Sequence, residues 1–125
     1  MHRDIKGGNL LLTKDGVLKI ADFGLAREFK RVNHPYFTVK VVTRWYRAPE
    51  LLLSNPAYTE AIDVWSVGCF VAEMFIGRPL FPARSDIDQL PVIAEKLGFP
   101  DEQSWENVTK LKGYNEMLKI YNDRR

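Results

Sequence analysis

The segment from residue 63 to residue 76 is the most apolar part of the chain, and it limits the possible folds more than any other feature. Ten of the side chains from Val64 to Ile76 are apolar, and on a helix they would cover nearly the whole circumference. Gly77-Arg78-Pro79 follows directly, a sequence that ends helices. We therefore predict a helix over residues 63–76 that is buried on most sides. A chain of 125 residues offers few other segments to cover it, so we expect the chain to belong to a larger domain.

The composition of the chain excludes several classes of protein. A formal charge of +2, without any run of Lys or Arg, gives no sign of a nucleic-acid partner. The single cysteine, Cys69, excludes an internal disulfide and fits a reducing compartment. The N-terminus lacks the apolar core of a signal peptide, and no run reaches the roughly 18 apolar residues of a membrane span. We expect an intracellular protein of the cytoplasm, the nucleus or both, with no nucleic-acid or membrane partner.

The first half of the chain contains two predictable elements. A β-hairpin is expected over residues 10–20, where two short apolar runs flank an Asp15-Gly16 turn. A short helix is expected over residues 48–53, with Pro49 early in it, where the missing N–H does no harm. Between them, residues 21–43 show no clear period, and connections of that length are usually functional or mobile.

A second amphipathic helix is expected from about Asp86 to Leu97, with Ser85 as its N-cap. Its apolar face would consist of Ile87, Leu90, Ile93, Ala94 and Leu97. After Gly98 no regular element is predicted, because the apolar residues are scattered among polar ones.

Polar groups suited to handling phosphate lie at both ends of the predicted hairpin. Asp4, Lys6 and Asn9 come just before it, and Asp22 comes just after it. A hairpin returns its two ends to the same place, so these side chains should converge. Two carboxylates and an amide supply the oxygen ligands that Mg²⁺ accepts, and a lysine supplies a cation for phosphate oxygens. Taken singly, Asp4 and Asp22 are more simply explained as turn residues.

Three short motifs, in order along the chain, decide between these interpretations. His2-Arg3-Asp4-Ile5-Lys6-Gly7-Gly8-Asn9 matches the pattern H-R-D-x-K-x-x-N, Asp22-Phe23-Gly24 matches D-F-G, and Ala48-Pro49-Glu50 matches A-P-E. Each tripeptide alone is weak evidence, whereas three in this order and spacing are specific. From its first residue to about Pro100, the chain resembles the protein kinase family.

The resemblance implies a protein kinase-like α+β fold. This chain would form part of the large, C-terminal lobe, mainly α-helical with a short β-hairpin. Residues 1–100 would be a partial kinase domain holding the catalytic loop, the activation segment, the central helix and the helix that follows. Residues 101–125 do not resemble the sequence that continues the kinase domain in the family. We interpret them as a diverged tail, or as part of an insert specific to this group of kinases.

The resemblance also implies roles for the residues near the hairpin. Asp4, Lys6 and Asn9 would be catalytic: Asp4 would accept the proton of the substrate hydroxyl, and Lys6 would stabilise charge on the transferred phosphoryl group. Lys6, Asn9 and Asp22 would bind ATP with Mg²⁺, and Asn9 and Asp22 would be the metal ligands. A lysine at position 6 is typical of Ser/Thr kinases. The Gly7-Gly8 spacer departs from the commoner proline-containing one, which puts the rate in doubt but removes no catalytic group.

The sequence from Val41 to Glu50 resembles the group of cyclin-dependent, MAP and cyclin-dependent-kinase-like kinases. In that group the arginine corresponding to Arg47 captures a backbone carbonyl of the preceding valine, so Val41, Val42 and Arg47 would select Ser/Thr-Pro substrates. The alternative for Arg47 is a surface salt bridge. Thr43 would hydrogen-bond near Asp4.

Further residues take regulatory or structural roles by the same resemblance. Thr38 would be the activation phosphosite, bound by the phosphate-binding arginines Arg3 and Arg27. Asp63 would receive backbone N–H groups of the catalytic loop, and Glu50 would be structural. Cys69 is expected to be a small core residue rather than a reactive thiol.

Two hypotheses about function follow. The first is that the chain is a fragment of a proline-directed Ser/Thr kinase. In the family an ATP-binding small lobe precedes the catalytic loop, so a fragment without it would be inactive alone. The second is that the chain is a non-catalytic, kinase-derived docking or competitor module. Expected partners are protein substrates with Ser/Thr-Pro sites, a cyclin-like activator and an upstream activating kinase.

Overall fold

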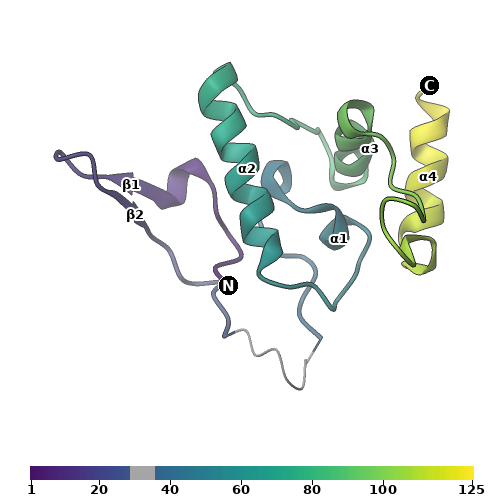
Figure 1. The fold of residues 1–125 in the computed structure, drawn as a ribbon, viewed down its shortest axis with the longest axis horizontal. Helices are drawn as coiled ribbons and strands as arrows, with labels where there is room; N and C mark the ends of the chain where they lie inside the picture. Colours follow the sequence, from purple (N-terminus) through teal and green to yellow (C-terminus); the bar gives the residue numbers. More distant parts are fainter. Residues whose placement is uncertain (29–35) are drawn as a thin grey trace.

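The computed structural model describes residues 1–28 and 36–125, and over these it is mainly α-helical with a two-stranded antiparallel sheet, as predicted. The hairpin projects from one side, the long helix α2 runs through the middle, and α3 and α4 lie on the other side (Figure 1). Three 3-10 turns accompany these elements, at Gly7–Asn9, Arg44–Tyr46 and Val108–Lys110. The strands and helices are β1 (Leu10–Leu12), β2 (Leu18–Ile20), α1 (Pro49–Leu52), α2 (Ala61–Ile76), α3 (Asp86–Leu97) and α4 (Tyr114–Asp123).

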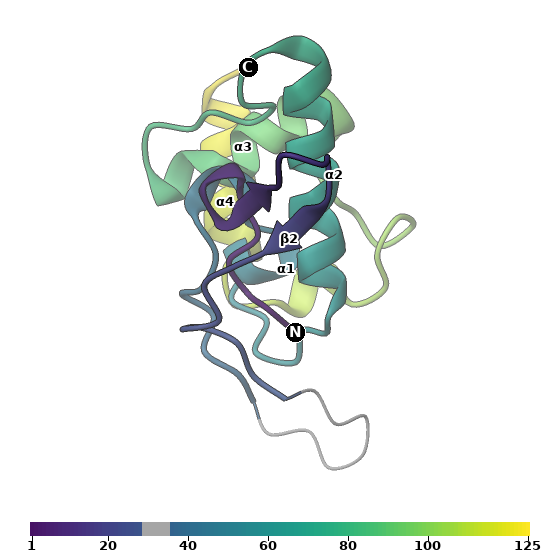
Figure 2. The same ribbon diagram turned by 90° about the vertical axis from the view of Figure 1, so that its left-hand side faces the viewer.

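The predicted hairpin forms, and its register brings its two ends together. Leu10 pairs with Ile20 and Leu12 with Leu18. Gly16 adopts a φ of 80°, which a residue without a side chain reaches without strain. One further bond, from the Ala21 N–H to the Asn9 carbonyl at 2.8 Å, continues the ladder to the residue before Asp22. Seen from the side, the hairpin stands in front of α2 (Figure 2).

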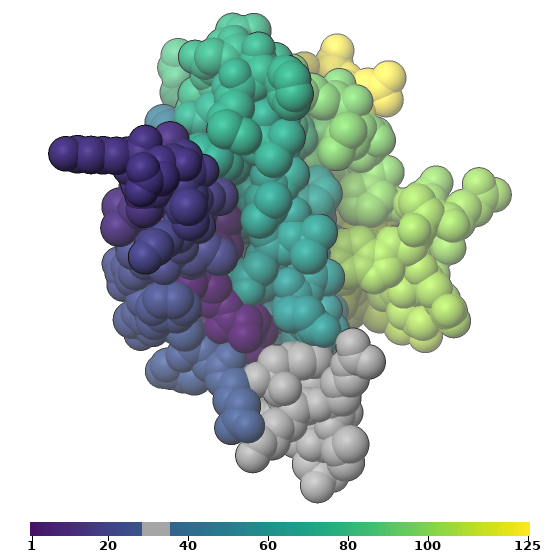
Figure 3. All heavy atoms as spheres, turned by 60° about the vertical axis from the view of Figure 1, so that its left-hand side comes forward, coloured from purple at the N-terminus to yellow at the C-terminus, as the bar shows by residue number. Residues whose placement is uncertain are grey.

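Helix α2 begins two residues before the predicted start and ends at Gly77 as expected. Gly77 has a φ of 71°, and its N–H bonds the Glu73 carbonyl at 2.8 Å. Helix α2 is buried on fewer sides than its apolar circumference predicts, and this agrees with the expected shortage of segments to cover it: Ile62, Ser66 and Cys69 are buried, whereas Val64 is 70% exposed and Phe75 is 87% exposed. Among the described residues, the neighbouring segments cover one face only, and much of the helix is open in Figure 3.

Helix α3 has the predicted bounds, and the Ser85 hydroxyl accepts the Asp88 N–H at 3.3 Å as an N-cap. Its predicted apolar face is only partly correct. Leu90, Ile93 and Ala94 are buried, but Ile87 and Leu97 are half or more exposed because they lie at the ends of the helix, beyond its neighbours. Leu90 and Ile93 join a core around α1, whose other members include Ala48, Leu51, Leu52, Leu53, Tyr58, Ile62 and Val108.

Helix α4 was not predicted from the sequence. Its inward side chains recur at helical spacing from Tyr114 through Met117 and Leu118. The Tyr114 hydroxyl donates to the Pro100 carbonyl at 3.0 Å, and Gly113 approaches the backbone of Leu53 so closely that a Cβ atom there would lie 3.3 Å from the Leu53 Cα. The tail of residues 101–125 therefore packs on α1 and α3. Of the helices described, none combines the length and hydropathy needed to cross a membrane.

Candidate functional site

The backbone of the segment before the hairpin is fixed by Asp63 of α2. The Asp63 carboxylate accepts the N–H of His2 at 2.7 Å and the N–H of Arg3 at 2.8 Å, which confirms the predicted contact. Arg3 has a φ of 70°, a left-handed conformation that typically costs a non-glycine residue about 1–3 kcal/mol. Such a conformation persists where the surroundings hold it, and the carboxylate of Asp63 provides that hold.

Asp4 lies at the centre of a set of polar contacts. Its Oδ1 atom accepts the hydroxyl of Thr43 at 3.0 Å, as expected from the sequence. Its Oδ2 atom accepts the amide of Asn9 at 3.1 Å and lies 3.7 Å from the Lys6 ammonium. The Asn9 amide also bonds the Asp4 carbonyl at 2.9 Å. Asp4, Lys6 and Asn9, which all precede the hairpin, therefore lie together.

His2, for which no separate role was predicted, links the two ends of the hairpin. Its Nδ1 atom accepts the Asp4 N–H at 3.2 Å, so Nε2 carries the proton and donates to the Ala21 carbonyl at 2.9 Å. The ring also meets the edge of Phe23, with centroids 5.2 Å apart. His2 thereby couples the position of Asp4 to the strand end that carries Asp22. Its place at the start of the first motif was the only available signal.

Asp22 directly follows Ala21, whose N–H bonds Asn9 and whose carbonyl bonds His2. The predicted convergence of the Asp22 side chain with Asp4 and Asn9 is not confirmed by any contact among the described residues. Asp22 has a φ of 60°, and its carboxylate accepts the Gly24 N–H at 3.2 Å. Its side chain is exposed and therefore open to a further ligand.

The oxygen atoms near Asn9 and Asp22 suit a magnesium ion chemically. Both bonds of the Asn9 side chain use the amide nitrogen, which leaves its amide oxygen for another ligand. That oxygen and the exposed carboxylate of Asp22 are hard donors of the kind Mg²⁺ takes, together with water and phosphate oxygens. No group of three or more His, Cys, Asp or Glu side chains able to hold a metal occurs in residues 1–28 and 36–125.

Arg47 captures the backbone carbonyls of two preceding valines, where the capture of one was predicted. Its Nε atom donates to the Val41 carbonyl at 3.0 Å and its Nη2 atom to the Val42 carbonyl at 2.9 Å. Val42 is buried and has a φ of 68°, an outlying conformation for a β-branched residue. The carbonyl of Val42 is thus turned to the guanidinium and occupied by it. The alternative for Arg47, a surface salt bridge alone, does not describe this geometry.

A second set of contacts, which the sequence did not indicate, ties this segment to the start of α3. The Arg44 Nε atom donates to the Asp86 Oδ1 atom at 2.8 Å, and the Arg47 Nη1 atom donates to the same oxygen at 3.3 Å. The Arg44 Nη1 atom bonds the Arg84 carbonyl at 2.9 Å, and the Trp45 indole bonds the Ala83 carbonyl at 3.0 Å. The arginines hold the pKa of the Asp86 carboxyl below its usual range, mainly through the Arg44 hydrogen bond.

Thr38 and Arg3 meet through the hydroxyl of Tyr58. That hydroxyl donates to the Thr38 carbonyl at 2.6 Å and accepts from the Arg3 Nη1 atom at 3.0 Å. The Thr38 residue is exposed. No hydrogen bond among the described residues joins Arg27 to this group; its Nη1 atom bonds the Ala26 carbonyl at 2.8 Å. The structure therefore brings together one of the two predicted arginines and Thr38, and the role of Thr38 stays a prediction.

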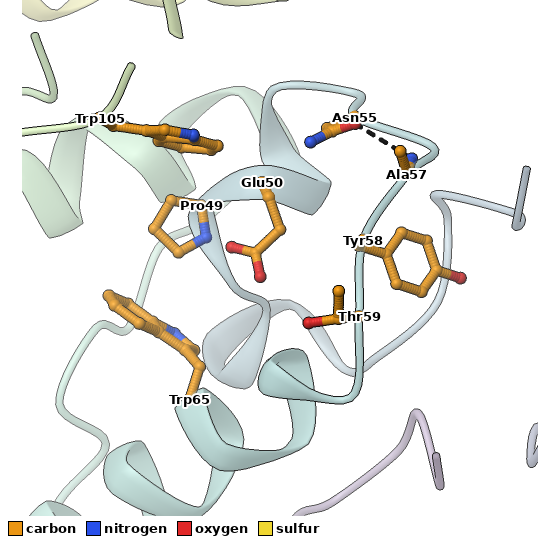
Figure 4. A pocket seen from close by; sticks show the side chains of 8 residues that line it. All are labelled: Pro49, Glu50, Asn55, Ala57, Tyr58, Thr59, Trp65 and Trp105. Atoms are coloured by element: carbon orange, nitrogen blue, oxygen red, sulfur yellow. Dashed lines mark hydrogen bonds between the residues drawn. The ribbon is translucent and has the colours of Figure 1, made fainter. Parts of the chain in front are cut away.

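Glu50 lines a cavity of about 360 Å³ between α1 and the start of α2. Figure 4 shows its carboxylate pointing into this cavity, in a space bordered by Pro49, Thr59 and Trp65. Burial raises the pKa of the Glu50 carboxyl, and within the described residues its side chain has no cationic partner. Cys69 is buried in the core as predicted, and burial raises its pKa to about 11.

Comparison with known families agrees with the motifs. The family model described as protein kinase domain matches residues 1–120. Cyclin-dependent kinase 7 of Caenorhabditis elegans is 52% identical over 114 residues, which are 91% of this chain and 34% of that protein. CTD kinase subunit alpha of Schizosaccharomyces pombe is 48% identical over 125 residues, which are 100% of this chain and 21% of that protein.

A solved structure shares the fold. One chain of the CAK complex from Chaetomium thermophilum, bound to ATP-gamma-S, matches with a TM-score of 0.84 and 46% sequence identity, over 90% of this chain and 34% of that chain. The present chain thus spans about a fifth to a third of the length of the curated relatives that it matches.

Proposed function

This chain belongs to the protein kinase family, and on that basis we propose that it carries the catalytic loop and substrate pocket of a Ser/Thr protein kinase that phosphorylates Ser/Thr-Pro sites. The observation that carries the proposal is the bond of 3.0 Å between the Thr43 hydroxyl and the Asp4 carboxylate. This bond holds Asp4, the proposed proton acceptor, next to the segment in which Arg47 binds the carbonyl of Val42. The reacting hydroxyl and the residue after it in a substrate would therefore be positioned by one continuous set of contacts.

In the proposed reaction, Asp4 orients the substrate hydroxyl and accepts its proton as the oxygen bonds to the γ-phosphorus of ATP and ADP leaves. Lys6, 3.7 Å from Asp4, lies where its charge would stabilise the phosphoryl group in transfer. The Asn9 amide oxygen and the Asp22 carboxylate would hold Mg²⁺. When bound, this ion neutralises charge on the phosphates. His2 and Asp63 hold the backbone of the loop and do not react.

Proline preference follows from the occupied carbonyl of Val42. A substrate residue other than proline would bring a backbone N–H to this place and find no acceptor, and an unpaired buried N–H costs about 1–3 kcal/mol. Proline has no N–H to lose. Because about 1.4 kcal/mol corresponds to a factor of ten, we expect roughly ten- to hundredfold selection of Ser-Pro over Ser-Ala.

The ATP requirement and the partners are part of the proposal. The CAK complex that contains the similar chain is bound to ATP-gamma-S, which supports ATP as the phosphate donor. The residues that grip ATP in the family lie before the catalytic loop, so we propose that residues 1–125 alone neither bind MgATP tightly nor phosphorylate protein. A cyclin-like activator, an upstream kinase acting on Thr38 and an intracellular location are proposed with it, on the similarity to cyclin-dependent kinases.

Peptide phosphorylation tests this function. The full-length protein that carries this chain, with MgATP and any activator that copurifies, is given matched Ser-Pro and Ser-Ala peptides. The expected result is phosphate transfer with Ser-Pro preferred, and no transfer by residues 1–125 alone. Equal use of both peptides would contradict the assignment of the Arg47 pocket, and transfer by residues 1–125 alone would contradict the proposed need for the small lobe.

A docking or competitor module is the second candidate function. It is favoured by one observation: Val41, Val42, Arg47 and Asp86, which form and brace the proposed proline pocket, all lie within this chain. Residues 1–125 would then bind Ser-Pro peptides in an equilibrium binding assay without modifying them. No difference in affinity between Ser-Pro and Ser-Ala peptides would contradict it.

A further inference from the structure

The carboxylate of Asp86 completes the set of acceptors around Arg47. The Nε and Nη2 atoms of Arg47 are taken by the carbonyls of Val41 and Val42, and its Nη1 atom donates to Asp86 Oδ1 at 3.3 Å. All three guanidinium nitrogens therefore have acceptors, and Asp86 is the one that carries charge. The Arg47 side chain is 15% exposed, whereas the Asp86 side chain is 56% exposed, so Asp86 holds the buried guanidinium from the solvent side.

We propose that Asp86 is a positioning residue for substrate selection, which holds the guanidinium of Arg47 on the carbonyl of Val42 and so keeps the pocket closed to residues other than proline. The proposal rests on the function proposed above, because it concerns the same pocket.

Charge provides the first argument for this role. Arg44 and Arg47 both donate to the same oxygen of Asp86, at 2.8 Å and 3.3 Å, so two guanidinium cations are held side by side by one negative charge. An uncharged side chain at position 86 would leave the two cations facing each other without compensation. Arg47 would then gain by turning toward solvent, and the carbonyl of Val42 would lose its donor.

Backbone strain provides the second argument. Val42 has a φ of 68°, a conformation that a β-branched residue leaves readily once nothing holds it. Its carbonyl is held by two nitrogens of Arg47, Nη2 at 2.9 Å and Nε at 3.3 Å. Release of the guanidinium would let Val42 relax and would free its carbonyl for the N–H of an ordinary substrate residue.

The loop that carries Asp86 has its own anchors, so the side chain can be tested without losing the loop. Ala83 and Arg84 accept the Trp45 indole and the Arg44 guanidinium through their backbone carbonyls, and neither bond involves the carboxylate of Asp86. Ser85 caps α3 through the Asp88 N–H. Asp86→Asn should therefore change the position of Arg47 while leaving the start of α3 in place.

The test compares two peptide substrates with the full-length protein. For Asp86→Asn we expect the ratio of kcat/KM for Ser-Pro over Ser-Ala to fall about tenfold, because the freed carbonyl offers Ser-Ala one hydrogen bond. The gain should appear mainly as a lower KM for Ser-Ala, with kcat on Ser-Pro changed by less than about twofold. Asp86→Glu keeps the charge and should restore most of the ratio. Glu95→Gln, on the same helix and 3.7 Å from Arg124, is the matched control and should leave the ratio unchanged.

The outcomes separate the two levels of the argument. A wild-type protein that transfers no phosphate to either peptide would overturn the proposed function and the role of Asp86 with it. A wild-type preference for Ser-Pro that persists unchanged in Asp86→Asn would overturn the role of Asp86 alone. Equal loss on both peptides, or failure of Asp86→Glu to differ from Asp86→Asn, would show a merely structural contribution and would also overturn it.

Discussion

The two hydrogen bonds at Asp63 predict a large and local effect of a single substitution. Asp63→Ala removes the acceptor of the His2 and Arg3 N–H groups, at 2.7 Å and 2.8 Å. Hydrogen bonds to a charged group contribute about 1.5–3 kcal/mol each. Both are only partly buried, and the released segment can hydrate, so the lower end of the range applies. We expect the free energy of unfolding of the chain to fall by about 3 kcal/mol.

The same substitution should free the backbone of Arg3. Its φ of 70° is unfavourable, so without Asp63 this residue should return to an ordinary conformation and move Asp4 with it. Asp63→Asn keeps one acceptor oxygen but turns an NH₂ group toward the second N–H. Its free energy of unfolding should therefore lie closer to that of Asp63→Ala than to that of the wild type.

Urea unfolding of residues 1–125, together with amide hydrogen exchange at His2 and Arg3, measures both effects. Asp123→Ala, at the exposed end of α4, is the matched control and should change stability by less than about 0.5 kcal/mol. A loss below about 1 kcal/mol in Asp63→Ala, with both amides still protected from exchange, would show that the carboxylate is not what holds the loop.

Three other properties of the chain can be checked separately. Burial raises the pKa of Glu50, so this carboxyl holds its proton more tightly in the folded chain than in the unfolded chain. The chain therefore loses stability as the pH rises from 4.5 through the higher pKa of the folded state. Glu50→Gln should therefore stabilise residues 1–125 by about 1 kcal/mol at pH 7, and not below pH 4.5; thermal melts at the two pH values that show the same difference would contradict this. The Cys69 thiol, with a pKa raised to about 11, should resist iodoacetamide at pH 8 in the folded chain and react in urea, and fast labelling without urea would show that it is not buried. Phosphopeptide mapping of the active full-length protein should find phosphate on Thr38, which lies beside Arg3 through Tyr58, and active protein in which Thr38 is always unmodified would end that proposal.

Local chemistry explains which parts of the fold could be predicted. The Asp15-Gly16 turn, the Ser85 cap and the glycine at position 77 act within a few residues, and the structure has each where the sequence indicates it. Helix α4 lacks such signals. It begins at Tyr114, and Gly113 before it provides no side-chain cap. Its apolar residues are separated by polar ones, so packing against α3 rather than local preference accounts for it.

Sequence separation explains which parts of the site could be predicted. The contacts of Asp4 with Thr43 and of Asp63 with Arg3 were expected from the resemblance to the protein kinase family. The bond between Arg44 and Asp86 joins residues 42 positions apart that belong to no shared motif. Arg44 meets Asp86 only because α3 starts beside residues 41–47. That placement results from the packing of the whole chain and not from local sequence.

Phosphate transfer by the Asp4 variant is the most direct test of the account. The full-length protein and its Asp4→Asn variant are compared with radiolabelled ATP, Mg²⁺ and the Ser-Pro peptide, after confirming that both fold and bind the peptide equally. Asp4→Asn keeps the acceptor for Thr43 but cannot take the substrate proton, so the rate of transfer should fall by about 100-fold or more while KM changes little. Transfer by Asp4→Asn at the wild-type rate would contradict the claim that this chain carries a kinase catalytic loop.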